Sequence, residues 1–95
     1  MEDRDTAVRR MKMRSMRRGI KEMDLILSDF AGRALDPMSD AGLALYDRLL
    51  EENDHDLFSW VNGQVPPPED YAALIAEIRA GAEGIVRPMR TASAD

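Results

Sequence analysis

The sequence contains no cysteine, and this absence excludes several classes of site. Without a thiol, the chain has no disulfide framework, no thiolate metal ligand and no cysteine nucleophile. Its folded state must depend on packing, hydrogen bonds and ion pairs. A chain without disulfides suits a reducing compartment, and we expect a cytoplasmic protein.

Long apolar runs are also absent from the sequence. No stretch approaches the roughly 18 to 20 apolar residues that a membrane-spanning helix requires. The N-terminal segment from Met1 to Asp5 carries three acidic residues, whereas a targeting peptide would be basic there. We therefore expect a chain that is neither inserted into a membrane nor processed.

The residues that catalysis or cofactor binding would need are few. His55, the single histidine, lies between Asp54 and Asp56 at an expected helix start, where an exposed position near a helix cap is the simplest interpretation. The neighbouring acids lack the loop length, the glycine and the terminal glutamate of a calcium loop. No glycine-rich phosphate loop is present. We expect no catalytic residue, no metal site and no cofactor held by this chain.

Charge is distributed unevenly along the chain. Seven Lys and Arg residues and no acid lie from Arg9 to Lys21, whereas three basic and fourteen acidic residues lie from Glu22 to Val86, and the net charge is -5. The basic run could be a solvated helix face, a docking surface for an acidic protein or a contact to nucleic acid. Because residues 1–29 contain no aromatic side chain to stack on a base, we expect no nucleic-acid partner. The other two interpretations remain open.

Apolar residues recur every three or four positions and never alternate over the length of a strand, which predicts an all-α fold. We expect a compact five-helix bundle that forms a single domain over residues 1–84, followed by a flexible tail at 85–95. The predicted helices run from a cap at Asp5 or Thr6 to about Arg17, from Ile20 to an end set by the Gly32 region and Pro37, from Ser39-Asp40 to about Glu51, from Asp54 or Asp56 to Asn62-Gly63, and from the prolines at 66–68 to Gly81–Gly84.

Two features of the core are predicted in particular. The first helix has a thin apolar stripe that we expect to include Met11 and Met16, so this helix is the least able to stand alone. The fourth helix carries Phe58 and Trp60, and this aromatic pair should anchor the core.

Gly19 lies between the basic run and the second predicted helix. In one interpretation it closes the first helix in the left-handed conformation, while Arg18 and Glu22 form an exposed pair worth at most about 0.3 to 0.5 kcal/mol. These two features conflict, because a break at Gly19 removes the helical spacing of the pair. In the other interpretation, the missing side chain lets another protein's backbone approach between two opposite charges.

The segment Arg18-Gly19-Ile20-Lys21-Glu22 matches an RGxxE motif, preceded by Arg17 and followed by Asp24. A Leu-Leu-Glu segment at 49–51 and an Asp-Leu-Phe-x-Trp segment at 56–60 follow. This pattern resembles the SdhE-type family of succinate dehydrogenase assembly factors, small proteins that promote covalent flavin attachment. The resemblance extends from about residue 11 to residue 78, and the family is a five-helix bundle.

The resemblance implies a binding protein rather than an enzyme. Its expected partner is the flavoprotein subunit of succinate dehydrogenase, in which a histidine of that subunit becomes bonded to FAD; the fumarate reductase flavoprotein is a second candidate client. The FAD belongs to the partner, and the free chain is expected to be a monomer. An antitoxin-like or regulatory binding protein is the alternative. The residues carried over as partner-binding are Arg17, Arg18, Gly19, Glu22 and Asp24.

Overall fold

The computed structural model of the chain describes residues 2–16 and 18–82, so Arg17 and the expected tail at 85–95 lie outside the described residues. Five α-helices, no strand and one short 3-10 turn are present in the described part, which confirms the all-α, five-helix prediction. The elements are α1 (Arg4–Ser15), α2 (Lys21–Ala34), α3 (Asp40–Leu49), α4 (Asp54–Val61), the 3-10 turn η1 (Glu69–Tyr71) and α5 (Ala72–Ala82).

Side-chain caps define the start of three helices. Asp3 caps α1 by accepting a hydrogen bond from the backbone N–H of Thr6 at 2.8 Å, so this helix begins before the expected cap at Asp5 or Thr6. Ser39 caps α3 and Asn53 caps α4 in the same way. Such caps each contribute about 1 kcal/mol. The start of α2 differs, because its N-cap residue Ile20 provides no side-chain cap.

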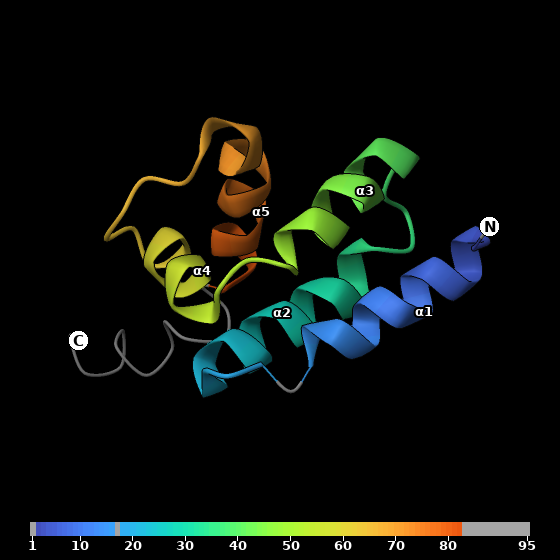
Figure 1. Ribbon diagram of the computed structural model, residues 1–95, viewed down its shortest axis with the longest axis horizontal. Coiled ribbons are helices and arrows are strands. Elements are labelled where there is room, and N and C mark those ends of the chain that lie inside the picture. The colour runs from blue at the N-terminus through green and yellow to red at the C-terminus, as the bar shows by residue number, and fades with distance from the viewer. Residues whose placement is uncertain (1, 17, 83–95) are drawn as a thin grey trace.

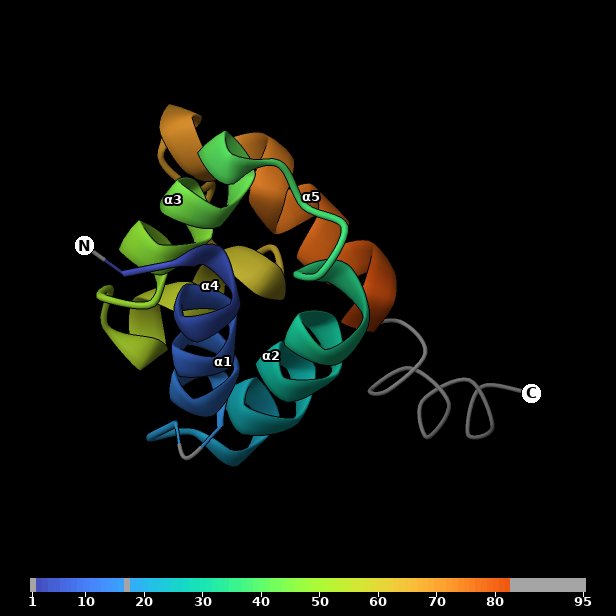
Figure 2. The ribbon, with the colours of Figure 1, turned by 90° about the vertical axis from the view of Figure 1, so that its right-hand side faces the viewer.

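Helix α2 is the centre of the bundle. It contacts α1 on one side and α4 and α5 on the other, and Figures 1 and 2 show it running beside α1 with α5 across from it. One face of α2 is buried throughout its length, by the residues Met23, Ile26, Leu27, Phe30 and Ala31. The helix continues through Gly32 to Ala34, which lies within the expected end region between Gly32 and Pro37. The glycine lies on the exposed side of a helix whose opposite face is held by packing.

Aromatic contacts join α2 to α3 and α4 to η1. The Phe30 and Tyr46 rings lie 5.6 Å apart, and the Trp60 and Tyr71 rings lie 5.9 Å apart, within the range of favourable ring pairs. Trp60 is buried as predicted, whereas Phe58 is only partly buried and packs against the edge of the core.

The prediction that Met16 belongs to the apolar stripe of the first helix is wrong. The side chain of Met16 is 51% exposed, because α1 ends at Ser15 and the backbone of Met16 is extended. Ser15 is buried instead, and its hydroxyl donates to the carbonyl of Met11 at 2.8 Å and lies 2.6 Å from the hydroxyl of Tyr46. A polar residue therefore takes part in the α1 contact with the core.

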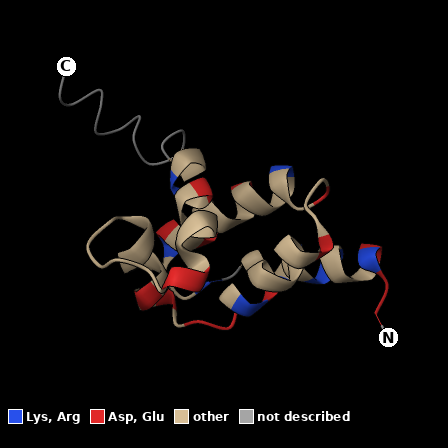
Figure 3. Cartoon of the chain, turned by 90° about the horizontal axis from the view of Figure 1, so that it is seen from above, with Lys and Arg blue, Asp and Glu red and all other residues tan. Residues whose placement is uncertain are grey.

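Ion pairs attach α1 to the rest of the bundle. Only Val8, Met11 and Ser15 of this helix are buried, but its cations reach acids of α3 and of the neighbouring loops: Arg4 to Asp40 at 2.7 Å, Arg10 to Asp47 at 2.8 Å, Lys12 to Asp36 at 3.1 Å and Arg14 to Glu51 at 2.6 Å. Figure 3 shows Lys and Arg segments close to Asp and Glu segments near the N-terminal end of the chain. Much of the basic run thus binds acids of the same chain.

Candidate functional site

The segment between α1 and α2 holds the RGxxE motif, and Arg18 fixes this segment to the bundle. The side chain of Arg18 is 10% exposed, and its Nε donates to Oδ1 of Asp54 at 2.7 Å. Its Nη1 donates to the carbonyls of Arg14 at 3.1 Å and Leu50 at 3.2 Å, near the ends of α1 and α3. A guanidinium is suited to this position, because carbonyls at helix ends lack partners within their helix.

Gly19 is held by the same carboxylate as Arg18. Its backbone N–H donates to Oδ2 of Asp54 at 2.6 Å. A Cβ atom at Gly19 would lie 2.9 Å from that oxygen, which is closer than real Cβ contacts allow. The φ angle of Gly19 is not in the left-handed region, where Gly63 is the only glycine among the described residues. The glycine is therefore explained by the close approach of Asp54, and the interpretation as a left-handed helix end is wrong.

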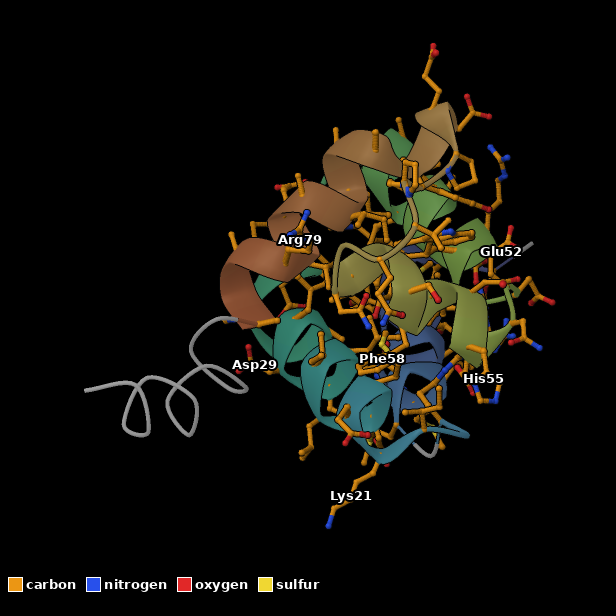
Figure 4. The ribbon with its side chains drawn as sticks, turned by 90° about the vertical axis from the view of Figure 1, so that its left-hand side faces the viewer. Lys21, Asp29, Glu52, His55, Phe58 and Arg79 are labelled. Atoms are coloured by element: carbon orange, nitrogen blue, oxygen red, sulfur yellow. The ribbon has the colours of Figure 1, made fainter. Side chains whose placement is uncertain are left out.

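Glu22 lies in the first turn of α2 and is exposed. The expected pair between Arg18 and Glu22 does not form, because Arg18 pairs with Asp54. Within residues 2–16 and 18–82, Glu22 makes no ion pair, and neither does the exposed Lys21 beside it. Figure 4 shows Lys21 pointing away from the bundle at this end of α2. The motif thus presents Glu22 outward while its arginine points inward.

The other carried-over residues differ in what the structure shows of them. Asp24 is partly buried, and its Oδ1 accepts from the hydroxyl of Ser28 at 3.3 Å. The same hydroxyl lies 3.4 Å from the carbonyl of Ser15, so Asp24 lies on the side of α2 that packs against α1. Arg17 lies outside the described residues. The structure therefore brings Arg18, Gly19 and Asp54 together, with Glu22 exposed on the following helix.

Asp54 is the site residue that the sequence did not single out. From the sequence, Asp54 is a helix-start acid beside His55 and one of the acids that lack the features of a calcium loop. Its contact with the motif spans 35 residues of chain, and sequence periodicity carries no signal at that separation. His55 itself is exposed, with its backbone N–H donating to Asn53 Oδ1 at 2.8 Å.

Perturbed pKa values occur beside the site rather than at its exposed surface. Burial raises the pKa of Tyr46 to about 12. Burial followed by a hydrogen bond to Glu52 at 2.8 Å raises the pKa of Tyr71. Both phenols are therefore neutral hydrogen-bond donors at physiological pH, and they serve packing between elements.

In the part of the chain that the structure describes, no three His, Asp or Glu side chains form a group that could hold a metal ion. The helices in that part are also too short or too polar to cross a membrane. An open groove between the α2–α3 connection and α5 is lined largely by apolar side chains, among them Met38, Leu45 and Leu74. Its lining includes Ala34 at the C-terminal end of α2, whereas the RGxxE segment ends in the first turn of that helix.

A model of the family described as flavinator of succinate dehydrogenase matches residues 9–82 of the chain. The match covers the segment of Arg18, Gly19 and Glu22 together with the helix of Asp54 that anchors it. The chain belongs to this flavinator family. The resemblance inferred from the RGxxE segment is thereby confirmed.

Three relatives carry the name succinate dehydrogenase assembly factor 2, mitochondrial. The relative from Aspergillus flavus is 46% identical over 72 residues, which are 76% of this chain and 24% of the relative. The relative from Meyerozyma guilliermondii is 45% identical over 71 residues, 73% of this chain and 53% of the relative. The relative from Schizosaccharomyces pombe is 41% identical over 70 residues, which are 74% of this chain and 50% of the relative. The chain spans about a quarter to a half of the length of these flavinator-family relatives.

The expected cytoplasmic location is wrong, because all three relatives are named as mitochondrial proteins. The expectation depended on the absence of cysteine and on the acidic N-terminal residues. Neither feature identifies a compartment, since a chain without disulfides suits any reducing environment.

Proposed function

We propose that this chain is an assembly factor that binds the flavoprotein subunit of succinate dehydrogenase and promotes covalent attachment of FAD to a histidine of that subunit. The observation that carries the proposal is the family match over residues 9–82, which includes the whole RGxxE segment and the helix that anchors it. The names of the relatives support the same role.

The chain acts by binding and not by catalysing the attachment itself. The bond-forming histidine and the FAD both belong to the client, and this chain holds no cofactor. Its own histidine, His55, is exposed at the start of α4, and its side chain makes no hydrogen bond or ion pair within residues 2–16 and 18–82. The client surface includes Glu22 in the first turn of α2, and Gly19 belongs to the segment that precedes this turn.

The physical mechanism is a shift of population in the client. Covalent attachment needs an arrangement of the flavoprotein that it adopts rarely alone, and a factor with higher affinity for that arrangement increases its population. Each 1.4 kcal/mol of differential affinity changes the ratio of the two arrangements about tenfold. A rigid surface serves this purpose, since a flexible one would adapt to both arrangements.

The test is to co-express the flavoprotein with and without this chain, in cells that lack their own factor, and to measure flavin fluorescence that survives denaturing electrophoresis. We expect fluorescence on the flavoprotein band to increase when the chain is present. Equal fluorescence in both samples would refute the proposal. The fumarate reductase flavoprotein, tested in parallel, shows whether it is a second client, and light scattering tests whether the free chain is a monomer.

A further inference from the structure

The carboxylate of Asp54 joins the arginine and the glycine of the RGxxE segment. Its two oxygens have separate tasks: Oδ1 accepts from Nε of Arg18 at 2.7 Å, and Oδ2 accepts from the backbone N–H of Gly19 at 2.6 Å. Because both oxygens are engaged, the plane of the carboxylate is fixed relative to the segment. Asp54 is itself only 21% exposed and lies in the first turn of α4.

Arg18 has little left to offer a partner. Besides Asp54, its guanidinium donates to the carbonyls of Arg14 and Leu50, and its last contact is the carbonyl of Glu52 at 3.5 Å. Its side chain is 10% exposed. A client could reach this cation only by displacing hydrogen bonds that join the ends of α1 and α3 to the start of α4.

Gly19 is also held by a contact within the chain, because the Asp54 carboxylate lies against it. A side chain there would collide with Oδ2 of Asp54 at 2.9 Å. A side chain at this position would therefore force the Asp54 carboxylate to shift in the free protein, before any client approaches.

We infer that Asp54 is a positioning residue, through which Arg18 and Gly19 set the direction in which the start of α2 presents Glu22 to the client. Helix α2 begins without a side-chain cap at Ile20, so the anchored segment before it determines where its first turn lies. This inference rests on the proposed function, because the client is the flavoprotein proposed above.

The first experiment is a double-mutant cycle of Arg18→Ala and Asp54→Asn, with the dissociation constant for the FAD-loaded flavoprotein measured by calorimetry. We expect each single variant to weaken binding about tenfold. The double variant should have about the same affinity as the weaker-binding single variant, because the two residues form one unit. If the two losses multiply instead, Arg18 contacts the client directly and the inference is wrong.

The second experiment places Gly19→Ala in two backgrounds. In the natural background the added methyl group displaces the Asp54 carboxylate, and we expect weaker client binding. With Asp54→Ala, the methyl group has room, and we expect no further loss from Gly19→Ala. An equal loss in both backgrounds would mean that the client's own backbone needs the glycine, which would overturn the inference.

Two controls separate positioning from loss of the fold. Asp56→Asn removes an exposed acid from the same helical turn and should leave binding unchanged. Gly63→Ala destabilises a turn distant in sequence and should also leave binding unchanged at a temperature where it is folded. The amide proton of Gly19, followed by NMR in the free chain, should move upfield in Asp54→Asn, and an unmoved resonance would contradict the inference.

The outcomes for the inference and for the proposed function are distinguishable. If the natural chain neither binds the flavoprotein nor increases covalent flavin, the proposed function fails, and the Gly19 resonance still tests whether Asp54 holds the segment. If the natural chain is active and the cycle is additive, the function stands and the positioning role of Asp54 fails.

Discussion

At the scale of single residues, the RGxxE segment divides into an inward half and an outward half. Arg18 is almost covered and makes its contacts within the chain, while Glu22 is exposed and without an ion pair in the described part of the chain. Removing one partner of a buried pair typically costs about 3 to 5 kcal/mol, whereas truncating an exposed side chain usually changes stability by less than about 0.5 kcal/mol. Substitution of Arg18 should therefore destabilise the fold, whereas substitution of Glu22 should leave stability nearly unchanged.

Replacing Glu22 with alanine should separate function from folding. We expect Glu22→Ala to reduce covalent flavin on the client while the thermal midpoint of the free chain stays within a few degrees of the natural protein, because the side chain is exposed. The matched control is Glu77→Ala, an exposed glutamate on α5, which should leave the flavin signal unchanged. In-gel fluorescence and thermal denaturation are measured for both variants. An unchanged flavin signal in Glu22→Ala would mean that Glu22 does not contact the client.

The buried hydroxyl pair of Ser15 and Tyr46 gives a second residue-scale prediction. Ser15→Ala should destabilise the protein by about 1 to 3 kcal/mol, because Tyr46 then keeps a buried O–H without its acceptor at 2.6 Å. Chemical denaturation measures this loss. In a Tyr46→Phe background the same change should cost less, since no orphaned hydroxyl remains. An equal cost in both backgrounds would show that the hydrogen bond is not responsible.

The site shows which residue roles were readable from the sequence. The spacing Arg18-Gly19-x-x-Glu22 located the segment, and the acids after Asn53 indicated a helix start at Asp54 or Asp56, of which the structure has Asp54. That the two would meet was not predictable, because the contact between Gly19 and Asp54 joins residues 35 positions apart. A glycine required by a close approach and a glycine required by its φ angle are identical in sequence.

At the scale of elements, helix type was predictable and helix ends less so. The apolar spacing located all five helices, but α1 begins earlier and ends earlier than expected. Packing explains why α2 continues through Gly32 to Ala34: the buried face of α2, with Phe30 and Ala31 next to Gly32, outweighs the weak helix propensity of one glycine. Local preference is a weak guide wherever tertiary contacts are strong.

Gly32 and Gly63 should respond to alanine in opposite ways. Gly32 lies within α2 with nothing within 4 Å of an added Cβ, so Gly32→Ala should stabilise the protein by about 0.5 to 1 kcal/mol. Gly63 has a φ of +85° after the end of α4, so Gly63→Ala should destabilise it by about 1 to 2 kcal/mol. Thermal denaturation should show shifts of opposite sign, of roughly 4 to 8 °C per kcal/mol. Shifts of the same sign would contradict these backbone assignments.

Helix α1 depends on ion pairs more than the other helices do. Arg10 and Asp47 form two parallel hydrogen bonds, at 2.8 and 2.9 Å, and this contact is partly exposed. We expect Asp47→Asn to cost about 0.5 to 1 kcal/mol and to increase hydrogen exchange in α1 selectively. Asp29→Asn, which removes a pair within α2, is the control and should leave α1 exchange unchanged. A loss of protection spread evenly over all helices would show that α1 is not a separate unit.

At the scale of the whole molecule, the uneven charge of the sequence is largely balanced by folding. Four of the seven cations in the basic run, Arg10, Lys12, Arg14 and Arg18, pair with acids of the same chain. Of the rest, Arg9 and Lys21 form no ion pair among the described residues. This arrangement agrees with the expectation of no nucleic-acid partner, which stays a prediction. It also makes the attachment of α1 sensitive to pH.

Acid should release α1 before the rest of the bundle unfolds. The hydrogen bond from Arg10 lowers the pKa of Asp47 below its ordinary value of 3.8, and the same arginine lowers the pKa of Glu2. The cap bond from Thr6 lowers the pKa of Asp3. A depressed pKa means that each carboxylate stabilises the folded state above its ordinary pKa, and that this contribution is lost as the pH falls through the folded value.

The three carboxylates all lie on or against α1, so the loss should be local to this helix. Below about pH 4 we expect amide protection in α1 to fall first. Trp60, packed on Tyr71 at the other side of the bundle, should keep its native fluorescence until a lower pH. Hydrogen exchange and fluorescence, measured over the same pH series, check the order. Coincident transitions would mean that the ion pairs of α1 are coupled to the whole core, and that α1 does not detach independently.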